Sequence, residues 1–175
     1  ANNDSGREIQ LSRDGREGLS YGHILWSPSS KALVAFRIEP GDRKEVYLIE
    51  SSPRDGGRAR LHSRPYALPG DKFPTYEVNV FDITSTNHIK PEVDRFEHEW
   101  LRPELHWSRD NQRFAYQQVD RGHQRLRVIE VDTATGKVRN LVDERSNTFI
   151  WTAHTENLGL NPITWLEQTD ELIHA

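Results

Sequence analysis

Short stretches in which polar and apolar residues alternate recur along the chain and predict β-strands. Residues 125–132 and 76–83 alternate with a period of two, the pattern of a strand with one buried face. Shorter apolar runs predict further strands at 32–38, 45–49 and 138–142. Turn residues separate these runs, and Gly136 in the turn at 132–137 can adopt positive φ at no steric cost. The pattern therefore predicts an all-β chain of short antiparallel strands.

A short unit that begins with tryptophan and ends in an apolar strand occurs more than once. Residues 26–36 resemble residues 107–116, since both contain Trp-Ser, a polar turn, a basic residue and a strand with alanine before an aromatic residue. A degenerate third copy follows at residues 165–173. Each copy predicts a β-hairpin, and the second continues to residue 142 as four short strands, the size of one propeller blade. We therefore expect a partial β-propeller with about two to three four-stranded antiparallel blades.

The repeats also set the expected blade boundaries. The three blades are expected at about residues 20–84, 103–144 and 147–175, the last of them being only the start of a blade. The first carries a long insertion, rich in Pro, Gly and Arg, at residues 51–74. Residues 85–102 are charged and are expected to form a loop with a short strand, although 90–100 is the one segment that could form a helix.

The composition favours a folded chain over a disordered one. Hydrophobic residues make up 34% and charged residues 29%, which is polar for a globular domain, but the 175 residues include five Trp, five Tyr and six Phe. The formal net charge of −4 argues against nucleic-acid binding, which requires a basic face. The absence of cysteine excludes a disulfide framework and any cysteine-based metal site. We expect neither a cofactor nor a metal.

The chain is expected to be a piece of a longer protein. It contains no methionine, begins in a polar tract at residues 1–6 and stops in the apolar run at 171–175. No apolar run approaches the roughly 18 residues of a membrane span, and no signal-peptide pattern is present. We expect a parent protein that is periplasmic or secreted, with the cytoplasm as the alternative, and no membrane partner.

Residues Gly18–Gly22 match the G-x-S-x-G pattern of a nucleophile elbow, with Ser20 in the nucleophile position and His23 directly after the motif. An elbow requires an apolar strand before the serine and a helix after it. Here a polar, turn-rich stretch precedes the motif, and a short strand interrupted by proline follows it. We therefore expect no catalytic residue in this chain. A small serine hydrolase built on Ser20 is a rival hypothesis, which labelling of Ser20 by a fluorophosphonate would support.

Three other groups of residues have both a functional and a structural interpretation. The acidic and histidine triplet at 97–99 could indicate a metal, but adjacent residues on an extended chain point to opposite faces, so a solvated loop is expected. The five Trp could stack on sugars or bases, but three lie at repeat positions, which favours packing between blades. Arg60, His62 and Arg64 form a basic patch on the insertion, either a solvated loop or a loop near a substrate entrance or a subunit contact.

Taken together, these motifs resemble the propeller domain of the dipeptidyl peptidase IV family, serine peptidases of the prolyl oligopeptidase clan. The Trp-Ser-Pro unit at 26–28 is common to many propellers. More specific is the segment 64–75, followed by 78–82, which looks like the family's PYPKAG…NP segment. Four of its positions fall in register: Pro65, Tyr66, Gly70 and Pro74. Residues 128–137 are similar to the family's blade ending, and the resemblance covers residues 8–175.

The resemblance implies that the propeller and a separate catalytic domain have different roles. In the family, the propeller gates and shapes a cavity over a separate C-terminal α/β-hydrolase domain, which carries the Ser-Asp-His triad, and nothing here resembles that domain. The propeller itself contributes two acidic residues, in a Tyr-Glu-Glu setting before the Trp-Ser-Pro unit, that bind the free α-amino group of the substrate. An ammonium in a partly dry cavity is well bound by two carboxylates. The implied partners are a peptide with a free N-terminus and the C-terminal hydrolase domain.

At the corresponding place this sequence departs from the family pattern. Residues 14–21 contain no consecutive acidic residues. Tyr21 aligns with the family's tyrosine, and Glu17 is the candidate substrate-binding residue, with Asp14 as the other acid that could substitute. Arg16 lies between the two acids and would neutralise part of their charge.

Two further expectations concern assembly and a rival function. An incomplete propeller leaves blade faces uncovered, so we expect a homo-oligomer, formed by dimerisation or by segment swapping. The alternative function is that of a non-enzymatic TolB-like propeller mediating protein–protein interaction, which shares the Trp-Ser-Pro repeats but lacks the long insertion. A hydrolase domain downstream in the parent gene would distinguish the two.

Overall fold

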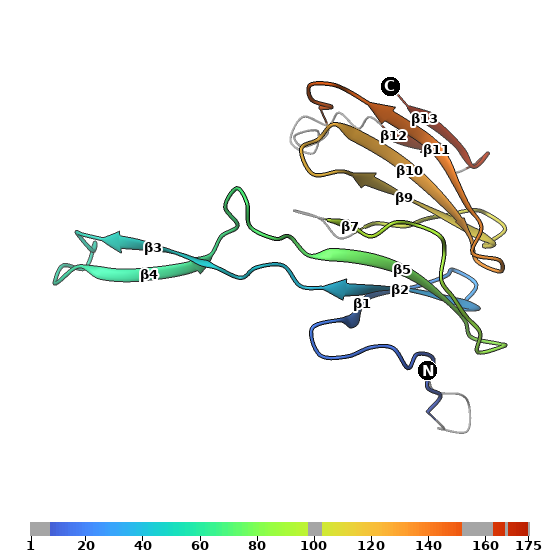
Figure 1. Cartoon of the computed structure of the whole chain (residues 1–175), viewed down its shortest axis with the longest axis horizontal. Coiled ribbons are helices and arrows are strands. Elements are labelled where there is room, and N and C mark those ends of the chain that lie inside the picture. The colour runs from blue at the N-terminus through green and yellow to red at the C-terminus, as the bar shows by residue number, and fades with distance from the viewer. Residues whose placement is uncertain (1–7, 98–102, 152–162, 167, 175) are drawn as a thin grey trace.

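The chain folds into antiparallel β-sheets. The structure, a computed structural model, describes residues 8–97, 103–151, 163–166 and 168–174. Every helix or strand assigned within these ranges is a β-strand, so the predicted all-β class is confirmed. Figure 1 shows three sheets stacked in sequence order and a hairpin that projects from the first of them.

The first sheet contains five strands: β1 (Ser20–Trp26), β2 (Ala32–Glu39), β5 (Thr75–Asp82), β6 (His88–Ile89) and β7 (Phe96–Glu97). Their order is β1-β2-β5-β6, and β7 also pairs with β5. Since β6 pairs with the end of β5 and β7 with its beginning, the outer strand of this sheet is split in two. The sheet therefore runs beyond residue 84, where we expected the first blade to end, and residues 90–97 form no helix.

The second sheet has four strands in the order β11-β10-β9-β8. They are β8 (His106–Trp107), β9 (Arg113–Val119), β10 (Arg125–Asp132) and β11 (Val138–Arg145). The third sheet pairs β12 (Ile163–Leu166) with β13 (Glu171–His174). The predicted third blade also includes residues 152–162, 167 and 175, which lie outside the described residues.

The repeated Trp-Ser units form the same turn in the first two sheets. The Ser27 amide donates to the carbonyl of Ala32 at 2.9 Å, and the Ser108 amide donates to that of Arg113 at 2.9 Å. Each serine hydroxyl also accepts a hydrogen bond from the backbone amide across the turn, at 3.0 Å in both cases. Three turn residues adopt positive φ near 57°, one in each copy of the repeat: Ser30, Asn111 and Asp170. The predicted hairpins are confirmed.

A second pair of turns repeats between the sheets. Asp82 opens the turn from β5 to β6 and Asp132 the turn from β10 to β11, and the aspartate amide donates across each turn at 2.9 and 3.0 Å. The fifth residue of each turn has positive φ, 60° at Thr86 and 72° at Gly136. A Cβ on Gly136 would lie 2.6 Å from Ile89 Cγ2, so glycine here also permits close packing between the two sheets.

The main core lies between the first and second sheets. Its buried members are Val34, Phe36, Val78, Val80 and Phe96 from the first sheet and Phe114, Tyr116, Ile129 and Val131 from the second. The rings of Phe36 and Tyr116 meet edge to face, with centroids 6.1 Å apart. A smaller core joins the second sheet to the third through Leu126, Val128 and Ile163. Sheets that bury both faces against neighbours are the expected arrangement for stacked blades.

The hairpin that leaves the first sheet consists of β3 (Glu45–Glu50) and β4 (Arg60–Pro65), and we call it the arm. All six residues of β3 pair with β4, and neither strand pairs with any other described strand. The sequence pattern indicated a blade strand at 45–49 and an insertion at 51–74. The structure differs because the 45–49 strand belongs to the projecting arm, and β5 is the blade strand that pairs with β2.

The tryptophans only partly follow the expectation of packing between blades. Trp107 packs against the main core, and Trp165 stacks on His106 with ring centroids 3.9 Å apart. Trp26 is 49% exposed, and Trp151 is 61% exposed. Trp26 pairs with Leu33 on the face of the first sheet turned away from the second sheet, and no sheet among the described residues packs against that face.

Candidate functional site

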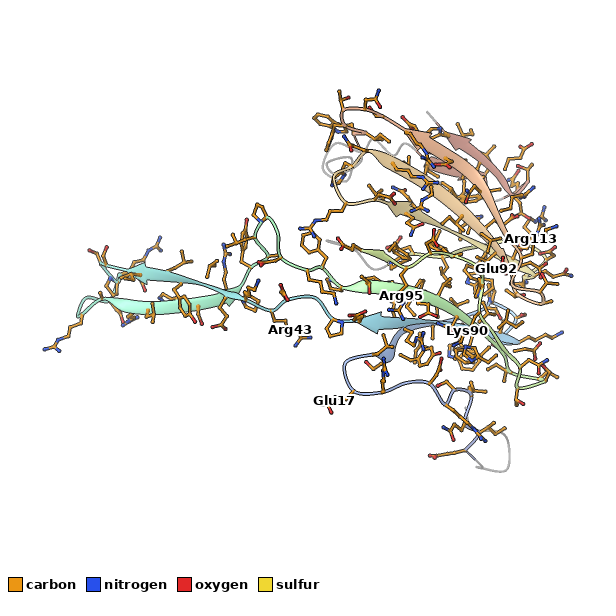
Figure 2. The ribbon with its side chains drawn as sticks, in the orientation of Figure 1. Glu17, Arg43, Lys90, Glu92, Arg95 and Arg113 are labelled. Atoms are coloured by element: carbon orange, nitrogen blue, oxygen red, sulfur yellow. The ribbon has the colours of Figure 1, made fainter. Side chains whose placement is uncertain are left out.

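Glu17, the predicted substrate-binding residue, lies at the tip of a two-residue turn that leads into β1. Arg16 and Leu19 exchange backbone hydrogen bonds of 3.0 and 2.9 Å across this turn, and Gly18 has a φ of 72°. The Glu17 side chain is exposed and makes no ion pair with any described residue. Figure 2 shows it at the end of the first sheet from which the arm leaves.

Asp14, the other acid of this segment, is engaged by two cations and a phenol. Its Oδ2 accepts from Arg37 Nη1 at 2.8 Å and from Lys90 Nζ at 2.6 Å. The Tyr21 hydroxyl donates to its Oδ1 at 2.9 Å. Lys90, Tyr21 and Arg37 together hold the pKa of Asp14 at about 2. Asp14 is therefore ionised at neutral pH, but its charge is already neutralised within the chain.

Arg37 lies at the centre of an ionic cluster on the first sheet. Its guanidinium donates to Glu77 Oε2 through Nη2 at 2.5 Å and through Nε at 2.9 Å. Arg95 donates to the same oxygen at 3.2 Å and to Glu39 at 3.2 Å. The side chains of Arg37 and Glu77 are only 14% and 19% exposed, so these charges are paired where water is largely excluded.

The cluster is not acidic overall. Its carboxylates are Asp14, Glu39 and Glu77, and its cations are Arg37, Lys72, Lys90 and Arg95. Because the cations outnumber the carboxylates and each carboxylate has a cation partner, the cluster offers no free pair of acids to an ammonium group. Glu17 is the acid of the 14–21 segment that stays open to a ligand.

A row of polar side chains linked by hydrogen bonds continues from Tyr21 into the first sheet. Asn79 is fully buried, and its Oδ1 accepts from His88 Nε2 at 2.8 Å and lies 3.4 Å from the Tyr21 hydroxyl. Burial and the hydrogen bond to Asp14 raise the pKa of Tyr21, and burial lowers the pKa of His88. His88 also stacks on Phe81, with ring centroids 4.4 Å apart. These hydrogen bonds fix Tyr21 and Asp14 in place, and the lowered pKa keeps the His88 imidazole neutral at neutral pH.

Ser20 does not lie in a nucleophile elbow. It begins β1 of an antiparallel sheet, opposite Ile38, and no helix follows it. His23 lies in the bulge of the same strand with a φ of 49°, and its Nε2 is 2.6 Å from the carbonyl oxygen of Pro103. Within the described part of the chain, no hydrogen bond joins Ser20 to a histidine, so the hydrolase hypothesis built on Ser20 has no structural support.

No metal site forms among the described residues, where no group of three His, Asp or Glu side chains converges. Glu97 of the predicted triplet pairs with Arg121 at 3.3 Å, and the other two members lie outside the described residues. On the arm, His62 bonds to Glu50 at 3.0 Å, and Arg60 bonds to Asp55 at 2.5 Å. The basic patch is therefore partly neutralised.

A polar cleft of about 610 Å³ separates the loop after β6 from β10 and β11. Four cations line it: Lys90, Arg125 and Arg127 pair with Asp14, Asp143 and Asp120, and Lys137 makes no ion pair with a described residue. Two acids, Glu92 and Asp94, line the same cleft, so it has no dominant charge and carries no assignment.

Sequence reasoning found Glu17, Asp14 and Tyr21 but missed Arg37 and Glu77. These two residues are directly opposite each other in the register of β2 and β5. An arginine inside an otherwise apolar run at 32–38 was the available signal, because a charge in such a strand requires a partner. Its partner could be found only once the pairing of β2 with β5, across the arm, was known.

Three comparisons with known proteins bear on the fold. A family model for the dipeptidyl peptidase IV (DPP IV) N-terminal region matches residues 1–173. A solved structure of a "putative dipeptidyl aminopeptidase IV" from Bacteroides ovatus ATCC 8483 superposes with a TM-score of 0.59 at 16% identity, over 91% of this chain and 23% of that one. Porphyromonas gingivalis dipeptidyl peptidase 4 superposes with a TM-score of 0.59 at 11% identity, over 93% of this chain and 24% of that one.

The two superpositions confirm the fold class, a partial β-propeller, and at these identities they show the fold alone. The chain spans about a quarter of the length of either solved structure. No curated protein matches the sequence. Among the described residues, no helix has the length and apolar character needed to cross a bilayer.

Proposed function

Since this chain belongs to the family of the dipeptidyl peptidase IV N-terminal region, we propose that it is a non-catalytic propeller segment of a serine peptidase. In this role it gates access and helps to bind peptide substrates for a separate C-terminal α/β-hydrolase domain. The observation that carries the proposal is the family match across residues 1–173. The absence of a catalytic constellation around Ser20 in the described residues supports the same division of labour.

Glu17 is the residue we assign to substrate binding. It would pair with the free α-amino group of a peptide, because it is an exposed carboxylate on the turn between the fixed residues Asp14 and Tyr21. Asp14 would act as a positioning residue: through Tyr21 and Arg37 it holds the segment from which the Glu17 turn projects. A single carboxylate binds an ammonium less strongly than a pair does, so weaker selection for a free N-terminus is expected than in a two-carboxylate site.

The test uses the full-length parent protein and two substrates, Gly-Pro-nitroanilide and the same peptide with a blocked amine. Cleavage of only the free-amine substrate would support a dipeptidyl peptidase. Cleavage of both would indicate an endopeptidase-like relative without an amine site. Cleavage of neither would overturn the peptidase proposal and favour the TolB-like binding propeller.

A matched pair of variants tests the role of Glu17. Glu17→Gln should lower kcat/KM for the free-amine substrate about tenfold, since a hydrogen bond to a charged group contributes about 1.5–3 kcal/mol. Glu92→Gln is the control, because Glu92 is an equally exposed carboxylate at the opposite end of the sheets (Figure 2). Equal effects of the two variants, or no effect of Glu17→Gln, would remove Glu17 from the site.

We also propose that the parent protein is periplasmic or secreted. This rests on the family membership; the lack of cysteine is compatible with the periplasm and with the cytoplasm, which is the alternative. Fractionation of the source cells with an antibody against this chain would distinguish the compartments.

A further inference from the structure

Three polar side chains lie together on the face of the second sheet that is turned towards the first sheet. Tyr116 and Gln118 are two residues apart on β9 and therefore share a face, the face on which Tyr116 joins the main core. Arg127 of β10 is directly opposite Gln118 in the register of the two strands, so its side chain lies on the same face. We call Tyr116, Gln118 and Arg127 the inter-sheet polar cluster.

The cluster is buried, and several of its polar atoms are unpaired. Gln118 is fully buried, Tyr116 is 2% exposed and Arg127 is 9% exposed. Four side-chain atoms have no hydrogen-bond partner among the described residues: Tyr116 Oη, Gln118 Oε1, Gln118 Nε2 and Arg127 Nε. Buried polar atoms in folded proteins are nearly always bonded to protein or to ordered water, because an unpaired one is costly. Four such atoms at one place therefore indicate a ligand.

The three side chains are close enough to share that ligand. Directly opposite residues of antiparallel strands have Cβ atoms about 4.5–5.5 Å apart, and residues two apart on one strand are separated by about 6.5 Å. Burial raises the pKa of Tyr116, and the positive charge of Arg127 opposes that rise. The Tyr116 hydroxyl therefore lies within the electrostatic reach of the guanidinium that adjoins Gln118.

The unpaired atoms require a ligand that both donates and accepts hydrogen bonds. Gln118 Oε1 only accepts, whereas Gln118 Nε2 and Arg127 Nε only donate. A metal cation or an anion would satisfy one of these kinds and not the other. The charge of Arg127 is already balanced by Asp120, which accepts from Arg127 Nη2 at 2.5 Å. The chemistry of the cluster therefore fits a small neutral molecule with both functions, and water is the simplest.

The first sheet presents aromatic rings to the cluster. Phe36 meets the Tyr116 ring edge to face and Phe96 stacks on it, with centroids 6.1 and 5.9 Å away. Solvent can reach the cluster from the other side, because Arg127 and Ile129 of β10 line the 610 Å³ cleft. Since β9 is the next strand inward from β10, the cluster lies at the inner end of that cleft.

We propose that the inter-sheet polar cluster binds ordered water between the first and second sheets. A buried water makes about three hydrogen bonds, so the four unpaired atoms correspond to roughly one or two waters. Water donates to Gln118 Oε1 and accepts from Arg127 Nε or Gln118 Nε2, and the Tyr116 hydroxyl can take either role. The interior between the two sheets is then apolar over most of its length and hydrated near the end of β9.

The direct test is a crystal structure of the full-length parent protein at a resolution that shows ordered water. We expect a water oxygen within about 2.7–3.2 Å of polar atoms from at least two of the three side chains. The structure of Gln118→Leu should lack this water, because the variant removes an acceptor and a donor at once. A cluster without water in the unsubstituted protein would overturn the proposal.

A double-mutant cycle tests the shared water in solution, by urea denaturation at low protein concentration. Gln118→Leu nearly preserves the side-chain volume, and Tyr116→Phe removes only the hydroxyl. Each should lower the equilibrium constant for folding about tenfold, because each takes hydrogen bonds from the water. Once Gln118→Leu has displaced the water, Tyr116→Phe should cost much less, so the two effects should not add. Additive effects, or a Gln118→Leu variant more stable than the unsubstituted chain, would contradict a shared water.

Gln117→Leu is the matched control. Gln117 is the neighbouring residue of β9, is only partly buried, and has its side chain on the opposite face of the sheet. Its substitution should leave the equilibrium constant for folding within about twofold. A loss as large as that of Gln118→Leu would show that the effect belongs to the strand and not to the cluster. None of these measurements uses peptidase activity, so the water site and the proposed function can fail separately.

Discussion

The first two sheets share the same pairing scheme and differ in one connection. In the second sheet, β9 and β10 are joined by residues 120–124, with the Asp120 amide donating to the carbonyl of Arg125 at 3.0 Å. In the first sheet, the equivalent strands β2 and β5 are joined by residues 40–74, which contain the arm. Both pairs of strands still align without a bulge, from Ala32–Asp82 to Glu39–Thr75 in one sheet and through seven pairs in the other.

This comparison shows that the blade does not depend on the length of the connection. The cost of closing a longer loop rises only slowly with its length, whereas the eight cross-strand pairs of β2 and β5 fix the register. Residues 41–42 and 72–73, which we call the neck of the arm, are joined by the Asp42 amide, which donates to the Lys72 carbonyl at 2.7 Å. The arm can therefore extend without disturbing the core.

The short turn at residues 120–124 of the second sheet also contacts residues 71–73, which lead from the arm back to β5. Arg121 of that turn lies over the Phe73 ring, 4.3 Å from its centroid, and donates to the Asp71 carbonyl at 2.9 Å. A guanidinium over an aromatic ring contributes about 0.5–1 kcal/mol at an exposed site. The two connections thus contact each other where the arm joins the stacked sheets.

The largest expected difference between the sheets and the arm is in how far truncation of an apolar side chain lowers the free energy of unfolding. Phe36→Ala should lower the free energy of unfolding by about 3–5 kcal/mol, because Phe36 is fully buried between the two sheets. Ile49→Ala on the arm should change it by less than about 0.5 kcal/mol in the monomer. Urea denaturation of both variants at low protein concentration measures this, and a similar loss in both would contradict the division into core and arm.

Arg37 should matter more than any exposed arginine. Arg37→Met should cost about 2–3 kcal/mol, because it removes the guanidinium that bonds both Glu77 and Asp14 in a largely buried position and leaves them with Arg95 and Lys90. Arg43→Met at the base of the arm is the control, since Arg43 is exposed. Thermal unfolding of the two variants gives the comparison, and equal melting temperatures would show that the cluster is not stabilising.

The neck should tolerate no side chain at Gly41. A Cβ there would lie 2.4 Å from the Lys72 carbonyl oxygen and 2.7 Å from the Phe73 carbonyl carbon, so Gly41→Ala should cost about 1–3 kcal/mol. Gly15→Ala is the control, because its Cβ would meet Tyr21 at an ordinary 3.5 Å. Hydrogen exchange at the neck should rise only in Gly41→Ala, and equal protection in both variants would refute the close approach.

The first sheet should also lose stability in two pH windows. The pKa of His88 is lowered by burial, so stability is greatest above pH 6.5 and falls as pH drops from 6.5 towards the pKa of the folded state. The pKa of Asp14 is lowered to about 2, so its contribution is present above pH 3.8 and is lost between 3.8 and 2. Asp14→Asn should reduce the loss between pH 3.8 and 2 without abolishing it, because the bond to Arg125 also lowers the pKa of Asp143 of the second sheet to about 2. An unchanged loss in that window, measured by urea denaturation at each pH, would show that Asp14 does not contribute to it.

The smallest effect should come from removing the arm. Replacing residues 43–70 by two glycines should change the free energy of unfolding by less than about 1 kcal/mol, since β3 and β4 pair only with each other among the described strands and most of their residues are exposed. Circular dichroism and urea denaturation at low protein concentration would measure it. Complete unfolding would show that the blade needs the arm.

The sequence by itself determined the strands, because local alternation and turn chemistry act over a few residues. Asp82 and Asp132 open equivalent turns, and Ser27 and Ser108 close equivalent hairpins, each recognisable without knowledge of any distant contact. The sequence offered Glu17 and Asp14 as the acids of the 14–21 segment, but the neutralisation of Asp14 by Lys90 involves residues that are far apart in the chain.

Only the tertiary structure decided which strands pair and which way their side chains face. The sequence repeat aligns Phe36 with Tyr116, but the matching turns make Ala32 equivalent to Arg113, so the alignment within the strands is shifted by one residue. A shift of one residue reverses the face of every side chain, which is why Phe36 and Tyr116 point towards each other from opposite sheets. In the same way, a short apolar run predicted a strand at 45–49 but could not assign it to the arm, because a strand's pattern does not specify the partner that covers it.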